Sequence, residues 1–533
     1  MTNYTVHFEP GNIAVEALSG TTLGEAARRA GFDLNQPCGG QGRCGRCAVI
    51  VDDARSAARR RSTIRLSADD VAAGYALACQ TVIEGDCWVT VPPQEAIERR
   101  LVTQKAVARV AVPFEYNPDR HQSIRRYFLR LDPPDYSDQT DDWSRVTREL
   151  ARQGVKDTRA SLALLRQMGA VLRAEFPQGD EPSGASDADG RASEFSQAES
   201  FRGEGWHAYS PWEVTAVVAL DTWDRPNGPA EVLALLPGDQ SDRNFGAAID
   251  IGTTTVTVWL VDLESGEVVA QAADYNGQIA RGEDVISRII YAKKPERLAE
   301  LQSLVLGTID RLLDAVCHQV HARKEEIFKV TVAGNPTVMH LFLSIPPEQI
   351  RLAPFIPAVN HPPSFSAAEL GLGVHPQAVV DCLPGVASYV GADISAGVLN
   401  TGMHEQAELT LFIDIGTNGE TVLGNADWLI TCACSAGPAF EGAGVEHGMR
   451  ATTGAIEEVW INSDTLEPTY RVIGRGDEKP RGICGSGLLS LLAEMFVTGV
   501  VDKAANLQIG RSPRIREGEH GPEYVVAWAP ETA

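Results

Sequence analysis

A run of cysteines and glycines near the N-terminus constrains the fold of this chain more than any other stretch. Cys38, Cys44 and Cys47 lie within ten residues, and four glycines fill most of the gaps. Cysteine thiolates hold iron–sulfur clusters, and a [2Fe–2S] centre takes four of them. Glycine adopts at no steric cost the positive-φ conformations that a tight loop around a cluster requires. The run therefore predicts a [2Fe–2S] site, with Cys79 in Ala-Leu-Ala-Cys-Gln-Thr as the fourth ligand.

Other uses of these cysteines leave alternatives open. Zinc ligands usually come as two closely spaced pairs, which three clustered cysteines and one distant cysteine do not match; a disulfide pair is the other alternative. Cys87 is an alternative fourth ligand, but its sequence Cys-Trp-Val-Thr-Val alternates like a half-buried strand and favours a core thiol. A cluster would use four of the ten cysteines and leave six scattered ones, which suits a reducing cytoplasm.

Residues 1–95 resemble a [2Fe–2S] ferredoxin of the β-grasp fold. Five residues separate the first two cysteines, as in the adrenodoxin-like branch, whereas the plant-type spacing has four. Alternating residues on both sides of Pro10-Gly11 predict a hairpin, and a helix is expected over 22–30. Five arginines between positions 55 and 65 are either a docking patch for an acidic partner or a solvated loop. We favour the solvated loop, in which they offset acidic neighbours.

Length and charge limit the classes of function. A chain of 533 residues predicts three or four domains, at about 150 residues each. Its net charge of −24 argues against nucleic-acid binding, which requires basic stripes. The N-terminus has no apolar signal-peptide region, and no run of about 18 apolar residues predicts a membrane span. We therefore expect a cytoplasmic protein with neither a nucleic acid nor a membrane as its partner.

The middle of the chain carries no recognisable chemical motif. Residues 96–125 are expected to be a connector that lets the cluster module move. Residues 126–243 are expected to form a middle domain, with a strand at Tyr127-Phe-Leu-Arg-Leu and helical structure over 143–168. A polar insert near 177–205 has too few apolar residues to bury and is predicted to be disordered.

The remaining residues, 244–533, contain an internal repeat. Asp-Ile-Gly-Thr occurs at Asp250 and again at Asp414, 164 residues later, each time between two apolar strand patterns. Helical patterns fill the interval, notably over 296–321. This layout is typical of a duplicated α/β domain.

Each Asp-Ile-Gly-Thr sequence predicts a glycine hairpin with defined chemistry. Backbone N–H groups and hydroxyls of such a turn converge on a concavity that suits phosphate oxygens. The aspartate can hold Mg²⁺, directly or through water, because Mg²⁺ prefers hard oxygen ligands and keeps much of its hydration. One such turn is also the sequence of a plain β-hairpin. Two in register, facing each other across a cleft, favour a nucleotide-phosphate site.

The repeat resembles the ATPase superfamily of actin, sugar kinases and heat-shock chaperones, which implies ATP with Mg²⁺ as the ligand. On that resemblance, Asp250 and Asp414 are the catalytic carboxylates, which position the metal and a water molecule. The residues implied to contact phosphate are Gly252, Thr253, Thr254, Thr255, Gly416, Thr417, Asn418 and Gly419.

For three further stretches, a purely structural role is an alternative to a functional one. Asn335, in Ala-Gly-Asn-Pro-Thr, either caps a helix or faces the cleft. Asp393, in Gly-Ala-Asp, is expected to be a helix N-cap rather than a catalytic acid. Cys432, Cys434 and Cys484 lie in glycine-rich stretches with poor metal-ligand spacing, so buried thiols are expected.

The whole arrangement resembles the reductive activators of corrinoid proteins. The resemblance spans nearly the whole chain and is weakest over 126–243. It implies a multidomain α+β and α/β protein: a β-grasp [2Fe–2S] ferredoxin, a small middle domain and a duplicated actin-like ATPase fold. Further matching stretches are Val332-Ala-Gly-Asn-Pro-Thr, Ala353-Pro-Phe-Ile-Pro, Ser435-Ala-Gly-Pro-Ala-Phe-Glu-Gly-Ala-Gly and Gly482-Ile-Cys-Gly-Ser-Gly-Leu.

The resemblance implies ATP-dependent, one-electron reduction of corrinoid Co(II) to Co(I) for methyl transfer. The implied partners are a corrinoid protein of a methyltransferase system and an upstream electron donor, and a homodimer is left open. The superfamily's adenosine motif is not evident before the sequence stops at Ala533, so we expect a truncated C-terminus or an incomplete adenine site. The alternative function is therefore an electron-transfer protein whose actin-like domain binds nucleotide or a partner without hydrolysis. A small-molecule kinase would give the cluster no role.

Overall fold

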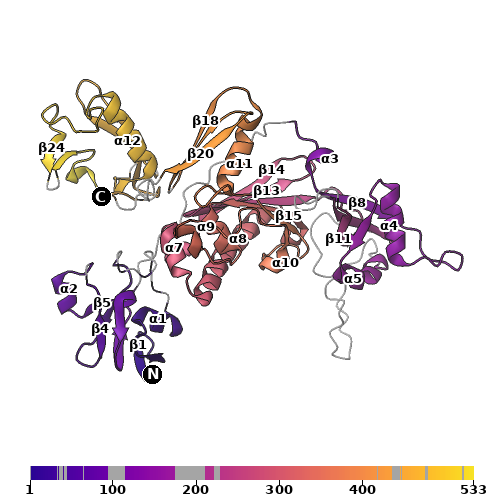
Figure 1. The fold of residues 1–533 in the computed structure, drawn as a ribbon, viewed down its shortest axis with the longest axis horizontal. Helices are drawn as coiled ribbons and strands as arrows, with labels where there is room; N and C mark the ends of the chain where they lie inside the picture. The colour runs from indigo at the N-terminus through magenta and orange to yellow at the C-terminus, as the bar shows by residue number, and fades with distance from the viewer. Residues whose placement is uncertain are drawn as a thin grey trace.

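The computed structural model covers the chain in several ranges that follow one another from indigo to yellow in Figure 1. The predicted insert near 177–205 and most of the expected connector lie outside these ranges, and the predicted domain boundaries stay predictions. No helix in the ranges covered is long and apolar enough to cross a membrane. The described residues are 2–32, 34, 36, 40, 42, 45–63, 65–93, 115–174, 210–220, 228–416, 418–434, 445, 447–449, 451–474, 478–518 and 521–533.

The N-terminal unit is a five-stranded sheet with a helix packed on it. The first strand of the N-terminal hairpin lies parallel to the last strand, which is at the centre of the sheet, and Val6, Phe8 and Leu23 form part of the core. Cys87 is fully buried in that last strand, so its prediction as a core thiol is confirmed. The elements are β1 (Asn3–Glu9), β2 (Ile13–Leu18), α1 (Leu23–Arg29), β3 (Ala48–Val51), β4 (Ala58–Arg60), α2 (Ala68–Ala72), β5 (Tyr75–Leu77), η1 (Ala78–Gln80), β6 (Thr81–Ile83) and β7 (Cys87–Thr90).

The second unit is a four-stranded sheet in the order β8-β10-β11-β9. One face packs against two helices, and the other packs, through Val217 and Leu233, against Phe328 of the next unit. The helical structure expected over 143–168 is not continuous, because a short strand divides it into two helices. The elements are α3 (Pro118–His121), β8 (Ile124–Arg130), α4 (Asp142–Arg152), β9 (Thr158–Ala160), α5 (Leu162–Leu172), β10 (Glu213–Ala219) and β11 (Ala230–Pro237).

The third unit is a six-stranded mixed sheet in the order β14-β13-β12-β15-β17-β16. A long helix covers the sheet and buries Leu313 against Ile249 and Val332. This helix starts at a proline, where the missing N–H group costs no intrahelical bond. The elements are β12 (Phe245–Ile251), β13 (Thr255–Asp262), β14 (Val268–Tyr275), η2 (Gly277–Ala280), α7 (Val285–Tyr291), α8 (Pro295–Gln319), η3 (Lys324–Glu326), β15 (Ile327–Gly334), α9 (Pro336–Phe342), η4 (Glu348–Arg351), β16 (Phe365–Ser366), α10 (Ala367–Leu370), β17 (Val379–Cys382), α11 (Ala392–Thr401) and η5 (Met403–Glu405).

The C-terminal unit contains two separate three-stranded sheets, β18-β19-β20 and β22-β21-β23, within the ranges covered. Leu411, Ile413 and Ile415 alternate along the first strand and are each at least half exposed. The second sheet packs against a helix around Val459 and Met495. The elements are β18 (Thr410–Ile415), β19 (Gly419–Gly424), β20 (Leu429–Cys434), β21 (Ala455–Ile461), β22 (Pro468–Val472), β23 (Gly482–Ile483), α12 (Gly485–Val497), β24 (Ile515–Gly518), β25 (Gly521–Tyr524) and η7 (Ala529–Glu531).

Candidate cluster site and nucleotide cleft

The predicted cluster loop closes on the end of strand β5. Cys79 lies in η1 and Cys47 directly precedes β3, and both thiols are buried. The two segments are joined because the Ala78 N–H donates to the Cys47 carbonyl oxygen at 3.0 Å. The Gln80 side chain fixes the loop by donating to the Gly40 carbonyl at 2.7 Å. Cys38 and Cys44, the other two predicted ligands, lie outside the described residues.

Three glycines give the cluster loop its shape. Gly40, Gly42 and Gly45 have φ values of 84°, 74° and 77°, in the left-handed region. A Cβ atom at Gly42 would also lie 2.6 Å from the Cγ atom of Gln80. Glycine is therefore required on two counts at this position. A repeatedly left-turning loop that carries buried thiols fits a thiolate-held [2Fe–2S] cluster.

The first Asp-Ile-Gly-Thr hairpin joins β12 to β13, and hydrogen bonds fix three of its carbonyl groups. The Gly252 N–H donates to the Thr255 carbonyl at 2.9 Å, which closes the turn. The Asn276 side chain donates to the Gly252 carbonyl at 2.9 Å, and the Asn276 N–H donates to the Thr254 carbonyl at 2.8 Å. Because these bonds fix the peptide planes, the opposite side of the turn is left for a ligand.

Thr254 supplies the observation that fits a phosphate at this hairpin. Its hydroxyl oxygen is buried and has no hydrogen-bond partner within the part of the chain that the structure covers. A buried polar group without a partner costs about 1–3 kcal/mol, and a phosphate oxygen would satisfy it. The neighbouring Thr253 hydroxyl, by contrast, accepts a hydrogen bond from the Asn335 side chain at 3.0 Å.

The second hairpin joins β18 to β19 through a turn that is one residue shorter than the first. The Gly416 N–H donates to the Asn418 carbonyl at 2.9 Å, and Asp414 lies directly opposite Glu420 in the strand register. Gly419 begins β19. Thr417 lies outside the described residues.

Four carboxylates from three segments, β12, α11 and the β18–β19 hairpin, interact electrostatically. Burial raises the pKa of Asp250 to about 6, and the negative charge of Asp414 adds to the rise. Burial also raises the pKa values of Asp414 and Glu420. Asp393 has its pKa raised to about 7 by burial and then by the charges of the other three. Like charges shift pKa values in this way at close range, and these shifts fit two hairpins that face each other.

Asp393 and Glu420 are cleft residues that sequence reasoning did not select. The N-cap prediction for Asp393 is wrong: Gly391 is the N-cap of α11, and the Asp393 carboxylate accepts from the N–H of Ile394, the next residue. For Glu420 the signal was its position across the hairpin from Asp414. Mg²⁺ is commonly bound by one or two carboxylates plus phosphate oxygens and water, and these acids could supply such ligands. Among the residues described, no three His, Cys, Asp or Glu side chains form a metal-binding group by themselves.

The other sequence expectations have mixed outcomes. The cap expected of Asn335 is confirmed, since its side chain accepts from the Val338 N–H at the start of α9; its amide also donates to the Thr253 hydroxyl of the first hairpin. The buried-thiol prediction is confirmed for Cys484 and wrong for Cys432 and Cys434, which are exposed on β20.

The arginine-rich loop in the ferredoxin unit pairs with neighbouring acids, as the solvated-loop reading expects. Arg59 contacts Glu84 at 2.6 Å and Arg60 contacts Asp53 at 2.9 Å.

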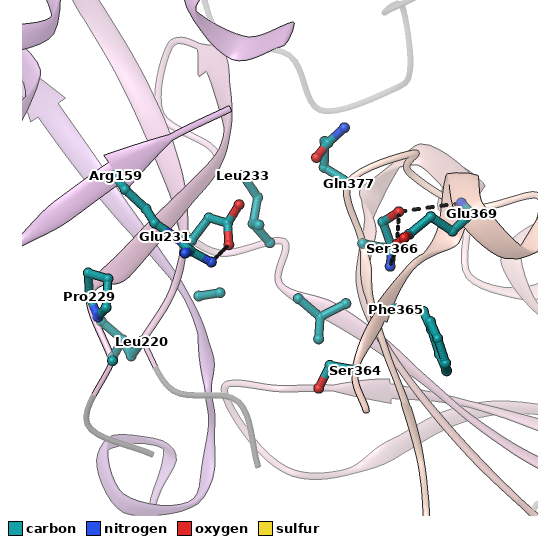
Figure 2. Close-up of a pocket in the computed structure, with 14 residues that line it drawn as sticks. Arg159, Leu220, Pro229, Glu231, Leu233, Ser364, Phe365, Ser366, Glu369 and Gln377 are labelled. Atoms are coloured by element: carbon teal, nitrogen blue, oxygen red, sulfur yellow. Dashed lines mark hydrogen bonds and ion pairs between the residues drawn. The ribbon is translucent and has the colours of Figure 1, made fainter. Parts of the chain in front are cut away.

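A pocket of about 300 Å³ lies away from the cleft, between β11 and the β16–β17 edge (Figure 2). Two pairs of its polar groups bond to each other: Arg159 with Glu231 at 2.6 Å, and the Ser366 hydroxyl with Glu369 at 2.7 Å. The residues predicted from the two hairpins do not line this pocket. The pocket therefore marks the joint between two units rather than a part of the cleft.

Comparison with known proteins places each part of the chain. Sequence models of protein families match four consecutive stretches. They are described as the 2Fe-2S iron-sulfur cluster binding domain (6–84), the RACo linker region (117–176), the RACo middle region (245–406) and the C-terminal domain of RACo, the ASKHA domain (408–533).

A solved structure of a reductive activator for corrinoid,iron-sulfur protein decides the family. It is 40% identical in sequence, with a TM-score of 0.62, and the match covers 99% of this chain and 78% of that one. The chain belongs to the family of reductive activators of corrinoid proteins. As a member of that family, it combines a [2Fe–2S] ferredoxin domain with an actin-like ATPase fold.

Two curated relatives carry related names. The corrinoid activation enzyme RamQ of Eubacterium limosum is 37% identical over 277 residues, which is 52% of this chain and 46% of that protein. The [Co(II) methylated amine-specific corrinoid protein] reductase of Methanosarcina barkeri is 27% identical over 295 residues, 50% of this chain and 53% of that protein. The matches therefore span about half the length of these curated relatives.

Proposed function

We propose that this chain is an ATP-dependent activator that returns the cobalt of a corrinoid protein from Co(II) to Co(I). The observation that supports it best is the presence, on one chain of this family, of a thiol-bearing cluster loop and a cleft with two phosphate hairpins. A bound [2Fe–2S] cluster supplies the electron. The protein would act in the cytoplasm, on a corrinoid protein of a methyltransferase system and with an upstream electron donor.

The chain's own residues take defined roles in this proposal. Asp250 and Asp414 hold Mg²⁺ and position the attacking water. The thiolates proposed to hold the cluster are those of Cys38, Cys44, Cys47 and Cys79. The phosphate contacts are proposed to come from Gly252, Thr253, Thr254, Thr255, Gly416, Thr417, Asn418 and Gly419.

Energetics explain why such a protein needs a nucleotide. Plant-type [2Fe–2S] clusters have potentials of about −400 mV, and the reduction of Co(II) to Co(I) needs a lower potential. Each ~59 mV by which the cobalt potential lies below that of the cluster costs a factor of ten in the one-electron equilibrium. A nucleotide shifts an equilibrium only by its different affinities for two states. Binding between the two hairpins must therefore favour the state in which cobalt is easier to reduce.

The alternative function is electron transfer with nucleotide binding but no hydrolysis. ATPase activity measured with and without a corrinoid protein separates the two functions, since only the activator hydrolyses ATP.

An anaerobic assay tests the main proposal. The protein is mixed with a Co(II) corrinoid protein, a reductant and Mg²⁺-ATP, and Co(I) is followed by its absorbance. We expect Cys44→Ser to abolish Co(I) formation and to leave nucleotide binding intact. Asp414→Ala is the matched control: it should weaken the ATP-dependent reaction and keep the visible absorption of the cluster. Co(I) formation at an equal rate in the Cys44→Ser protein would contradict the proposal.

A further inference from the structure

The ferredoxin unit lies beside α7 and α8 of the third unit (Figure 1), and charged side chains join the two units. Glu25 on α1 accepts hydrogen bonds from Lys294 and Arg297, the latter at 3.0 Å. Arg28, one turn further along α1, lies 3.9 Å from Glu300 and stacks over a tyrosine ring of α7. Three of these ionic side chains are no more than a quarter exposed, so the contact is more than a loose surface encounter.

This docking places the cluster loop against residues 280–283. On one side of the loop, the Gln36 N–H donates to the Ala280 carbonyl at 3.0 Å. On the other side, Arg46, next to the predicted ligand Cys47, pairs with Glu283 at 3.3 Å. Both ends of the cluster loop therefore contact one short segment of the nucleotide-binding unit.

A single buried arginine joins that segment to the first phosphate hairpin. Arg288 on α7 is fully buried and donates through Nε to the Gly282 carbonyl at 2.9 Å. Through Nη1 it donates to the Gln278 side chain at 3.1 Å, and through Nη2 to the Thr253 carbonyl. One rigid, planar guanidinium thus connects the surface under the cluster loop with the peptide of the phosphate turn.

We propose that Arg288 is a positioning residue that couples docking of the [2Fe–2S] domain to nucleotide binding at the 252–255 hairpin. The inference rests on the proposed function and identifies the contact that links the cluster domain to the nucleotide site. The docked ferredoxin unit holds residues 280–283, these hold Arg288, and Arg288 fixes the Thr253 peptide.

The geometry sets the sign of the coupling. A turn held in its binding conformation pays less ordering cost when a phosphate arrives, so it binds more tightly. Docking therefore strengthens nucleotide binding. Coupling between two binding equilibria is reciprocal, so nucleotide must strengthen docking by the same factor and hold the cluster loop at residues 280–283.

Charge reversal at the docking face tests this coupling away from the cleft. In the full chain, Lys294→Glu with Arg297→Glu should weaken binding of a non-hydrolysable ATP analogue with Mg²⁺ by about five-fold or more, within the usual range of coupling energies. Adding Glu25→Lys should restore much of the affinity. The matched control is Lys156→Glu with Lys503→Glu, which changes the net charge equally at two exposed sites. Equal loss of affinity in the control, or no loss in the docking variant, would overturn the proposal.

Hydrogen exchange at Gln36, measured with the analogue at a saturating concentration for each protein, provides a readout that is separate from nucleotide affinity. Its amide donates to Ala280 only in the docked arrangement, so the analogue should slow its exchange in the wild-type chain. Arg288→Lys, which keeps the charge but loses the fork of donors, should abolish this slowing while Gln36 exchange without nucleotide stays near the wild-type rate. Slowing of equal size in the variant would exclude Arg288 as the connection.

The two experiments separate failure of the coupling from failure of the proposed function. A wild-type chain that binds no ATP analogue at all contradicts the nucleotide site, and with it this inference. A chain that binds the analogue with the same affinity in every docking variant contradicts the coupling alone and leaves the nucleotide site in place.

Discussion

At the scale of single residues, the cleft concentrates negative charge that a cation must balance. Asp393 is the strongest case, since burial and three acidic neighbours raise its pKa to about 7, against about 3.9 in an unfolded chain. A carboxyl whose pKa is raised on folding stabilises the fold below its unfolded pKa. That contribution is lost as the pH rises through its folded pKa. The ligand-free protein should therefore lose stability between about pH 4 and pH 7.

Asp393→Asn should remove this pH-dependent cost. At pH 8 without Mg²⁺ or nucleotide, the variant should be more stable than the wild type by about 4 kcal/mol, because a neutral amide replaces a buried charge and each unit of pKa shift corresponds to about 1.36 kcal/mol. At pH 4 the difference should nearly vanish, since the carboxyl is then protonated in the folded chain and partly protonated in the unfolded chain as well. Thermal unfolding at the two pH values measures the effect, and a variant less stable at pH 8 would contradict it. Affinity for Mg²⁺-nucleotide should fall at the same time.

The two adjacent threonines of the first hairpin make a matched pair. Thr254→Val removes a buried hydroxyl that has no partner among the described residues, so stability should stay the same or rise. Affinity for a nucleotide should fall about ten-fold, the value of one lost hydrogen bond. Thr253→Val instead removes the acceptor of the Asn335 bond and should lower stability by about 1 kcal/mol. Denaturant titration and nucleotide binding of both variants test the contrast, and an unchanged affinity in Thr254→Val would refute it.

At the scale of elements, the packing of α9 against the phosphate hairpin depends on one side chain. Asn335 caps α9 and reaches Thr253 with its amide. Asn335→Ala should lose both interactions and cost about 1–2 kcal/mol of unfolding free energy, of which the cap accounts for about 1. Asn335→Ser keeps a capping oxygen but cannot reach Thr253, so it should fall between the wild type and the alanine variant. Equal stabilities for the serine and alanine variants would show that the cap contributes nothing.

Much of this element structure follows from local patterns, and the rest depends on distant contacts. The two hairpins and the long helix α8 were predictable because apolar periodicity and glycine turns are local signals. The sequence did not indicate β9, which interrupts the helical pattern after Arg152, because its pairing partner lies on β11, about 70 residues away. Asp393 was misread for the same reason: its position in α11 suggests a cap, whereas its environment comes from residues on other segments.

At the scale of the whole molecule, the arrangement of the units depends on charge. A chain with a net charge of −24 repels itself at long range, yet the ferredoxin unit lies against α7 and α8 through Lys294, Arg297 and Arg46. The connector predicted at 96–125 was expected to let the cluster module move. Sequence patterns could not predict the docking, because it pairs charges about 270 residues apart.

This docking should weaken as salt is added. The Debye length falls from about 10 Å at 0.1 M to about 3 Å at 1 M ionic strength, which screens the partly exposed pairs of Glu25 and Glu283. Small-angle scattering should therefore show a larger radius of gyration at 1 M than at 0.1 M salt. The Lys294→Glu, Arg297→Glu protein should be expanded at both salt concentrations and change little between them, because its ferredoxin unit is already released. A wild-type radius that stays constant would mean that apolar or hydrogen-bonded contacts such as Gln36 with Ala280 hold the units together, and that charge only guides their approach.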